Sequence, residues 1–177
     1  ANGRSTVAEG TNVMVIPGLT DRSLTVNFPN ESGRGGVAAL QILSNASNPG
    51  NVAGSLSVTG ADSKIEIADG LDISFVGSIT VSGEGKLSKV GAGTLTFAGV
   101  AMGNLTVDAG VLALGDATFT DSTVTVNVAN GLTLGAGTYD GLTVNLAENA
   151  SAQATAETVT LGALAGAGSF DLDGATS

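Results

Sequence analysis

Short stretches of alternating apolar and polar residues, separated by glycine, dominate this sequence and limit the folds that it can adopt. Residues 89–114 show the pattern most clearly, with TLTF at 94–97, NLTV at 104–107 and VLAL at 111–114. A period of two residues is typical of strands with one buried face, whereas an amphipathic helix repeats about every 3.6 residues. The sequence therefore predicts an all-β fold built from many short strands.

The same alternation continues along most of the chain. Residues 35–46 (GGVAALQILSNA) fit a short helix and a buried strand equally well. Loop-like residues at 29–36 and 44–51 suggest a boundary, so we expect an N-terminal strand or cap segment at 1–50 and a repetitive body at 51–177. The remaining expected strands lie at 12–16, 23–28, 55–59, 64–68, 71–76, 78–82, 86–89, 94–97, 104–107, 111–114, 122–128, 132–134, 142–146, 158–161 and 169–172.

Two architectures accommodate such a series of strands, a β-sandwich of hairpins and a β-solenoid that stacks equivalent strands in parallel. Hairpin turns favour Asn-Gly and Asp-Gly, which most of the corners here lack. GAGTLTF at 91–97, GAGTYDG at 135–141 and GAGSFDL at 166–172 are variants of one phrase, as expected of a degenerate repeat. We expect a parallel β-solenoid with about 20–24 residues in each turn, and a β-sandwich is the alternative.

Residues 89–114 resemble the autotransporter-associated β-strand repeat of secreted bacterial β-helical passenger domains. The matching pieces are GAGTLTF at 91–97, GNLTV at 103–107 and AGVLAL at 109–114. The middle turn departs from the family pattern, because it reads AGVAMG where the family is rich in Asn, Thr and Tyr. The resemblance implies a right-handed parallel β-helix at the cell surface or outside the cell.

Charge is distributed unevenly along the chain, whose net charge is −10. All six basic residues lie within residues 1–89, which carry eight acidic residues as well, and residues 90–177 carry eight acidic residues and no basic one. Nucleic acids and anionic membranes bind clustered Lys and Arg, so we expect neither as a partner. No apolar run approaches the roughly 20 residues of a membrane-spanning helix. The opening residues ANGRST resemble the mature end left by signal-peptide cleavage, so we expect a secreted protein.

Side chains that carry catalysis are scarce in this sequence. It has no histidine and no cysteine, which excludes Ser-His and Cys-His nucleophile pairs and the common zinc sites. The carboxylates that come nearest to a catalytic cluster, Asp69 and Asp72, fit turn residues, and the sequence offers one Tyr and no Trp to hold a sugar. We expect a protein that is not an enzyme, and a glycan-cleaving β-helix is the least favoured alternative.

Calcium is the one metal for which the acidic residues leave room, and no other cofactor is expected. Asp171 and Asp173 precede Gly174 in a fragment of a calcium-loop pattern that lacks the closing Glu. Single carboxylates at expected corners are further weak candidates, at Asp108, Asp116, Asp121 and Asp140. Four Asn-x-Ser/Thr sequons occur, at Asn30, Asn45, Asn104 and Asn149.

The two ends of a solenoid carry unpaired strand edges that must be capped or paired. The first strands either cap their own chain or pair with a neighbouring copy, through Val13, Val15, Leu24, Val26 and Phe28. Strand addition between copies produces open head-to-tail polymers. We therefore expect a self-assembling extracellular subunit of a filament or surface layer, and the alternative is an adhesin fragment that binds glycans or neighbouring cells.

Overall fold

The chain forms an all-β parallel solenoid, and every described strand pair is parallel. The computed structural model includes side chains from Lys64 onward, apart from Ile73 and the residues outside the described ranges. The described backbone covers residues 12–15, 23–28, 38–43, 51–59, 63–67, 69–70, 72–75, 77–82 and 86–172. These residues contain no helix, so the expected all-β class and solenoid are confirmed and the β-sandwich is wrong.

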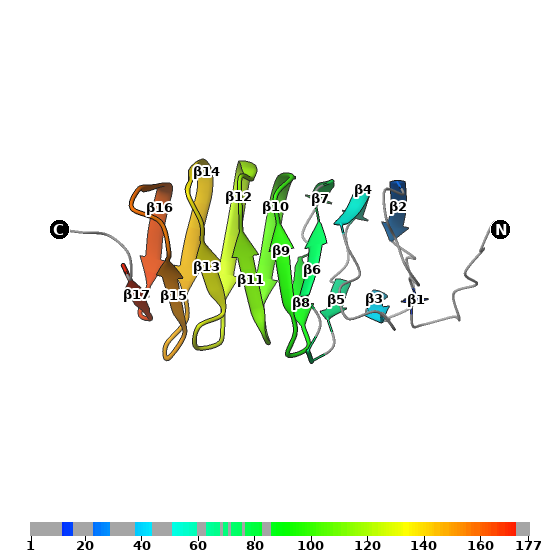
Figure 1. Cartoon of the computed structure of the whole chain (residues 1–177), viewed down its shortest axis with the longest axis horizontal. Coiled ribbons are helices and arrows are strands. Elements are labelled where there is room, and N and C mark those ends of the chain that lie inside the picture. The colour runs from blue at the N-terminus through cyan, green and yellow to red at the C-terminus, as the bar shows by residue number, and fades with distance from the viewer. Residues whose placement is uncertain are drawn as a thin grey trace.

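The strands form three rows that run along the solenoid, and each complete turn from Asp72 onward adds one rung to each row (Figure 1). The first row contains β6 (Asp72–Phe75), β9 (Thr94–Phe97), β11 (Val111–Leu114), β13 (Leu132–Leu134), β15 (Ser151–Ala154) and β17 (Ser169–Asp171). The second row contains β2 (Ser23–Phe28), β4 (Asn51–Thr59), β7 (Ser78–Ser82) and the first halves of β10 (Val100–Val107), β12 (Thr118–Val126), β14 (Gly137–Leu146) and β16 (Val159–Gly166). The third row contains β1 (Asn12–Val15), β3 (Ala38–Leu43), β5 (Ser63–Ile67), β8 (Leu87–Val90) and the second halves of those four strands.

About five turns make up the well-described body, beginning at β6, β9, β11, β13 and β15. Turn length varies, because Leu95 pairs with Ile73, 22 residues before it, and with Leu112, 17 residues after it. The expected 20–24 residues per turn is therefore too long for some turns. The right-handed winding that the resemblance implies stays a prediction. β1 and β17 lie at opposite ends of the stack (Figure 1).

The N-terminal strands pair in parallel with the strands that follow them. β2 pairs with β4, and β3 pairs with β5, so sheet pairing crosses residue 50. Residues 38–43 form a strand, which resolves the ambiguity between helix and strand at 35–46. The division of the chain at residue 50 stays a prediction.

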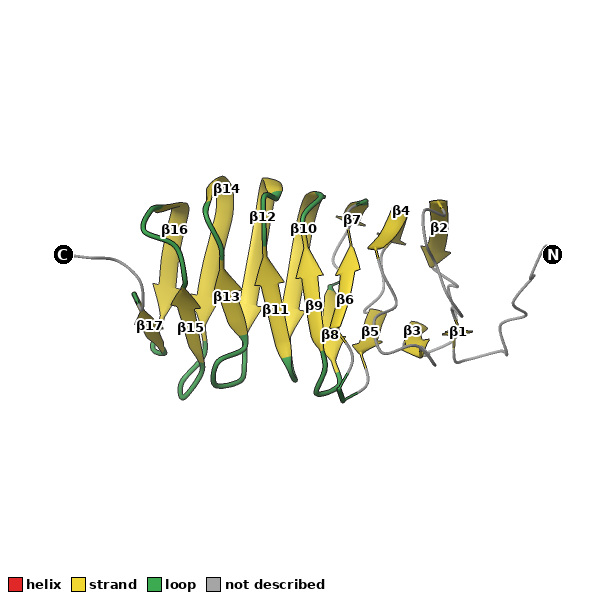
Figure 2. Cartoon of the chain, viewed as in Figure 1, coloured by secondary structure: helices red, strands yellow, loops and turns green. Residues whose placement is uncertain are grey.

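Four strands, β10, β12, β14 and β16, turn the corner between the second and third rows without ending. β10 bends at Gly103 (φ 97°), and the facing β12 has an extra residue, Asp121, in the left-handed region (φ 45°). β14 shifts register between Tyr139 and Thr143. Glycine tolerates positive φ, and aspartate tolerates it better than most residues, which explains why these residues stand at the bends. Figure 2 shows other described corners, in green, as loops between strands.

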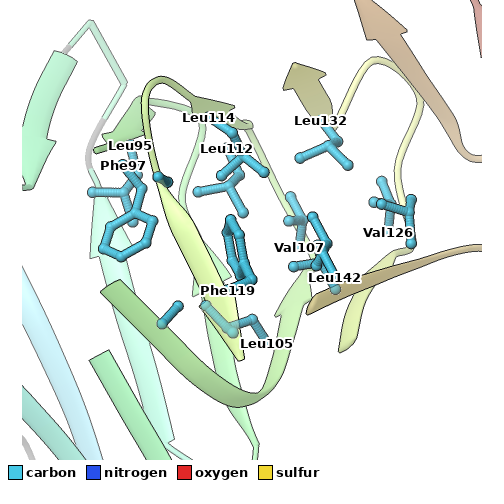
Figure 3. Close-up of a cluster of buried hydrophobic side chains, with 14 of the residues drawn as sticks. Leu95, Phe97, Leu105, Val107, Leu112, Leu114, Phe119, Val126, Leu132 and Leu142 are labelled. Carbon is cyan, nitrogen blue, oxygen red and sulfur yellow. The ribbon is translucent and has the colours of Figure 1, made fainter. Parts of the chain in front are cut away.

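Inward-facing side chains line up in columns along the solenoid axis, because successive rungs pair in register. Leu95, Leu112, Leu132 and Ala152 form one such column in the first row. All four are at most 3% exposed. Figure 3 shows side chains from neighbouring rungs meeting in the interior. Fully burying one Leu, Ile or Val contributes about 1.5–3 kcal/mol, so a column supplies a large share of the stability of its turns.

Aromatic side chains cross the interior from the first row to the second. Phe75, Phe97, Phe119 and Tyr139 are successive neighbours, with ring centroids 6.0, 6.0 and 6.1 Å apart. Ala101 and Phe119 occupy the same position of the second row in successive turns. The turn that has the large Phe97 in the first row therefore has the small Ala101 in the second. One void among the described core residues, beside Ile65, Leu87 and Phe97, has a volume of about 10 Å³, roughly that of one water molecule, which is too small for a ligand.

We predict that Gly91→Ala destabilises the fold much more than Gly70→Ala does. Both glycines have similar positive φ values, 78° and 75°, so both substitutions incur about 1 kcal/mol of backbone strain. A Cβ at Gly70 meets nothing within 4 Å, whereas a Cβ at Gly91 collides with the backbone carbonyl of Ile67. Chemical denaturation should show a loss of about 1 kcal/mol for Gly70→Ala and about 3 kcal/mol or more for Gly91→Ala. Equal losses would contradict the close approach of the two turns at Gly91.

Candidate functional site

A lysine occupies a core position in the third row. Lys89 in β8 pairs with Ile65 on one side and Val107 on the other, and both of these are buried. Lys89 itself is 3% exposed. Its position two residues after the buried Leu87 places the two side chains on the same face of the strand. A charged side chain at such a position needs partners in the interior, since an unpaired buried charge is strongly unfavourable.

The ammonium group of Lys89 is held by backbone carbonyls at the corner between the third and first rows. Nζ donates to the carbonyl oxygens of Gly91 (2.7 Å), Ala109 (2.9 Å) and Gly93. These carbonyls belong to two successive turns of the solenoid. Gly110 leaves the space for Nζ, because a Cβ at that position would collide with it. Lys89 therefore joins two corners by charge-assisted hydrogen bonds.

Burial lowers the pKa of Lys89 from 10.5 to about 8, because removal from water disfavours the charged ammonium. An amine with such a pKa has the basicity of a nucleophile near neutral pH. This one lies inside the solenoid and directs its hydrogen bonds at main-chain oxygens, so its surroundings fit a structural role rather than a reactive one.

Tyr139 has a comparable role at the corner between the first and second rows. Its ring is fully buried, and the single proton of its hydroxyl has three carbonyl oxygens within hydrogen-bond distance, those of Gly115 (2.8 Å), Gly135 (3.1 Å) and Leu114 (3.3 Å). Gly115 and Gly135 belong to successive corners. Burial and the nearby Asp116 carboxylate raise the pKa of Tyr139, since both disfavour the phenolate. Lys89 and Tyr139 thus both contact corner carbonyls from inside. Some of these, such as those of Gly93 and Leu114, also accept a backbone N–H from the next turn.

The two acidic residues at the C-terminal end that the sequence singled out as calcium candidates are Asp171 and Asp173. Asp171 is exposed at the end of β17, and Asp173 lies outside the described residues. No group of three or more potential metal-ligating side chains occurs in the part of the chain that the structure describes.

Two of the other acidic candidates accept hydrogen bonds from side chains of the next turn. Asp72 accepts a hydrogen bond from Thr96 (3.2 Å), and Asp108 accepts one from Asn127 (2.7 Å). Both pairs join successive turns on the surface. The remaining carboxylates among these candidates, Asp69, Asp116, Asp121 and Asp140, are exposed. The calcium candidates stay a prediction.

Two of the four sequons fall within the described residues. Asn104 and Asn149 are exposed, and Asn149 has a left-handed backbone (φ 66°) at a corner. Asn30 and Asn45 lie outside the described residues.

The proposed interface residues belong to the two N-terminal strands. Val13 and Val15 lie in β1, and Leu24, Val26 and Phe28 lie in β2. Only the backbone of these strands is described. Among the described strands, β1 pairs with β3 alone and β2 with β4 alone, so each stands at an end of its row.

The C-terminal rung is the most exposed apolar part of the described structure. Leu164 in β16 is 50% exposed, although it pairs with Val144, which is fully buried. Leu172, just after β17, is 60% exposed. Among the described residues, β16 pairs only with β14 and β17 only with β15, so the outer edges of both strands are open. The sequence predicted strands at 158–161 and 169–172, but it did not indicate that Leu164 would be left exposed at the end of its column.

Comparison with protein-family models, with curated proteins and with solved structures gives no match to this chain. None of the described residues forms a helix long and apolar enough to cross a membrane.

We predict that the free energy of unfolding rises by about 2 kcal/mol between pH 7 and pH 9.5 through Lys89. The pKa of Lys89 is about 8 in the folded chain and near 10.5 in the unfolded chain. In this interval the folded chain binds fewer protons than the unfolded chain, so raising the pH stabilises the fold. The raised pKa of Tyr139 acts in the opposite sense only above pH 10.

Urea denaturation of the wild type and of Lys89→Met at several pH values measures this contribution. The difference in stability between the two proteins should grow in favour of the wild type as the pH rises to 9.5. A constant difference across that range would show that Lys89 titrates normally and that its burial is wrong.

Proposed function

We propose that this chain is a non-enzymatic structural subunit, exported from the cell, that assembles end to end into a surface filament or layer. One observation carries the proposal: the C-terminal rung presents Leu164, half exposed, on a strand edge that continues the sheet. An exposed apolar strand edge is a template for pairing with another chain. Soluble proteins normally protect such edges, so an unprotected one is a candidate assembly site.

The resemblance to the autotransporter-associated repeat supports the extracellular part of the proposal. The three pieces of that resemblance correspond to β9, the second half of β10 and β11, each with the glycine-containing corner or bend before it. Together they span one full turn and the first strand of the next. We propose on this basis that the solenoid is right-handed and belongs among secreted passenger-type β-helical proteins.

The proposal assigns no catalytic role to this chain because of the side chains that it has and lacks. The sequence has no His or Cys, and the acidic candidates within the described residues are exposed and form no group of three or more. The most perturbed amine, that of Lys89, is occupied by backbone carbonyls. The chain is a parallel solenoid with an uneven distribution of charge, which suits a structural or adhesive role.

A second candidate function, an adhesin fragment, has one observation in its favour. Val100 and Met102 are 53% and 46% exposed on the outer side of β10, and exposed Thr118 and Thr120 stand beside them on β12. This flank offers apolar contacts to a glycan or to a protein of a neighbouring cell. It is small, because the outward residues on the adjacent β7 are Ser78 and Thr80.

We predict that the purified chain forms ordered fibres or sheets whose proportion increases with protein concentration. Net charge of −10 opposes close approach of copies, so raising the ionic strength from about 0.01 M to about 0.15 M should promote assembly by shortening the screening length. Negative-stain electron microscopy and sedimentation velocity measure both effects. Discrete particles with a concentration-independent sedimentation coefficient would exclude assembly and favour the adhesin function.

A further inference from the structure

We infer that the outer edge of β16 at Ala163–Gly166 receives β1 (Asn12–Val15) of a second copy, added head to tail. This inference rests on the proposed function, since it names the partner and the contact through which copies assemble. It commits to one sheet row, the third, and to one orientation of the incoming copy.

The receiving edge lies at the bare end of an apolar column. Leu87, Leu105, Val124, Val144 and Leu164 follow one another in register along the third row. The first four are 2%, 7%, 0% and 0% exposed, whereas Leu164 is 50% exposed. The abrupt change at Leu164 means that the column lacks its next member there. A further rung would bury that side chain as each earlier rung buries its predecessor.

β16 carries none of the features that normally protect a free strand edge. Its sequence, VTLGALAG, contains no lysine, no other charged residue and no proline. Lys and Pro on an edge, or a charge pointing inward, are the usual protections against pairing with another chain. The half that pairs with β14 through residues 163–166 is built from Gly, Ala and Leu, so an incoming backbone meets little steric hindrance.

β1 is suited to be the incoming strand because it lies in the same row as this half of β16. Among the described strands it pairs only with β3, and it pairs in parallel. Stacking a second copy in the same orientation therefore adds a parallel strand to a parallel row. β1 has four residues, and four residues of β16 are in register with β14 in this row. Because the two ends of the subunit differ, the contact does not close on itself, and repeated addition gives an open filament.

Charge favours head-to-tail over tail-to-tail contact. Residues 90–177 carry eight acidic residues and no basic one, so two C-terminal ends repel each other. Residues 1–50 carry three basic residues, Arg4, Arg22 and Arg34, and three acidic residues, Glu9, Asp21 and Glu31. An N-terminal end of zero net charge thus meets a strongly acidic one without that repulsion.

Substitution of Leu164 tests the receiving edge. We expect Leu164→Asp to weaken self-association at least about 100-fold, because it places a charge where an apolar side chain should be buried. Met102→Asp is the matched control, since Met102 has a similar exposure of 46% but lies on the flank, and it should change association less than about 3-fold. Sedimentation velocity measures association, and circular dichroism with urea denaturation at low concentration measures the fold.

The inference is overturned if Leu164→Asp associates as the wild type does. It is also overturned if the substitution lowers the stability of the monomer and leaves association unchanged, because the occupant of the edge would then be another part of the same chain.

Cysteine cross-linking tests the donor strand and the orientation, since the natural sequence has no cysteine. Ala165→Cys is mixed in turn with single-cysteine variants at positions 12 to 15, and each mixture is oxidised. A disulfide that joins the two different variants in at least one mixture is the expected result. A disulfide between two Ala165→Cys chains means tail-to-tail contact and overturns the inference.

Different results contradict the assembling function and the contact between β1 and β16. Fibres without any mixed disulfide leave the assembling function intact and remove β1 as the donor. Monomers at every concentration remove both.

Discussion

Each inward side chain in this solenoid packs against the side chains one turn before and one turn after it, and the rest of the fold depends on that contact. Parallel pairing in register brings equivalent positions of neighbouring rungs about 4.8 Å apart. Leu95, Leu112 and Leu132 therefore stack on one another, although they are far apart in the sequence. A slip of one residue would turn such a column toward solvent, so the apolar pattern fixes the register.

The corners are the places where this stacking could fail. A corner breaks the regular pairing of main-chain groups, and unpaired carbonyls near the core are unfavourable. Lys89 and Tyr139 contact carbonyl oxygens at the corners from inside, and each connects the corners of two successive turns. Their polar atoms lie in the interior because main-chain carbonyl oxygens of neighbouring turns are within hydrogen-bond distance there. Among the described residues, the core is thus mainly apolar, and these two side chains place polar groups at two of its corners.

The sequence predicted the parts of this structure that depend on large apolar residues. Strands such as SLTVNF at 23–28 and SITVS at 78–82 have the expected bounds. β15 (Ser151–Ala154) was missed because its inward residues are Ala152 and Ala154, which are too small and too weakly strand-forming to mark a strand. The first halves of β10 and β12 were missed because glycine and aspartate were interpreted as loop residues. In the structure Gly103 and Asp121 lie within bent strands.

The structural role of Lys89 was also missed, and its signal was present in the sequence. Leu87 and Lys89 are two residues apart in one strand, so a buried Leu87 implies that Lys89 points the same way. A charged residue at an inward position is normally assumed to be exposed. Hydrogen bonds to carbonyl oxygens stabilise the buried ammonium group. One of these oxygens belongs to Ala109, 20 residues away, and only the three-dimensional structure brings it near.

A stack held together by contacts between neighbours has an end where those contacts are missing. Native-state hydrogen exchange, compared between dilute and concentrated protein, tests this consequence most directly. The amides of β16 and β17 should exchange rapidly in dilute solution and become protected on assembly, whereas those of β11 to β14 should be protected in both states. Equal exchange of β16 and β17 in the two states, or strong protection of their outer edges in the monomer, would contradict the account.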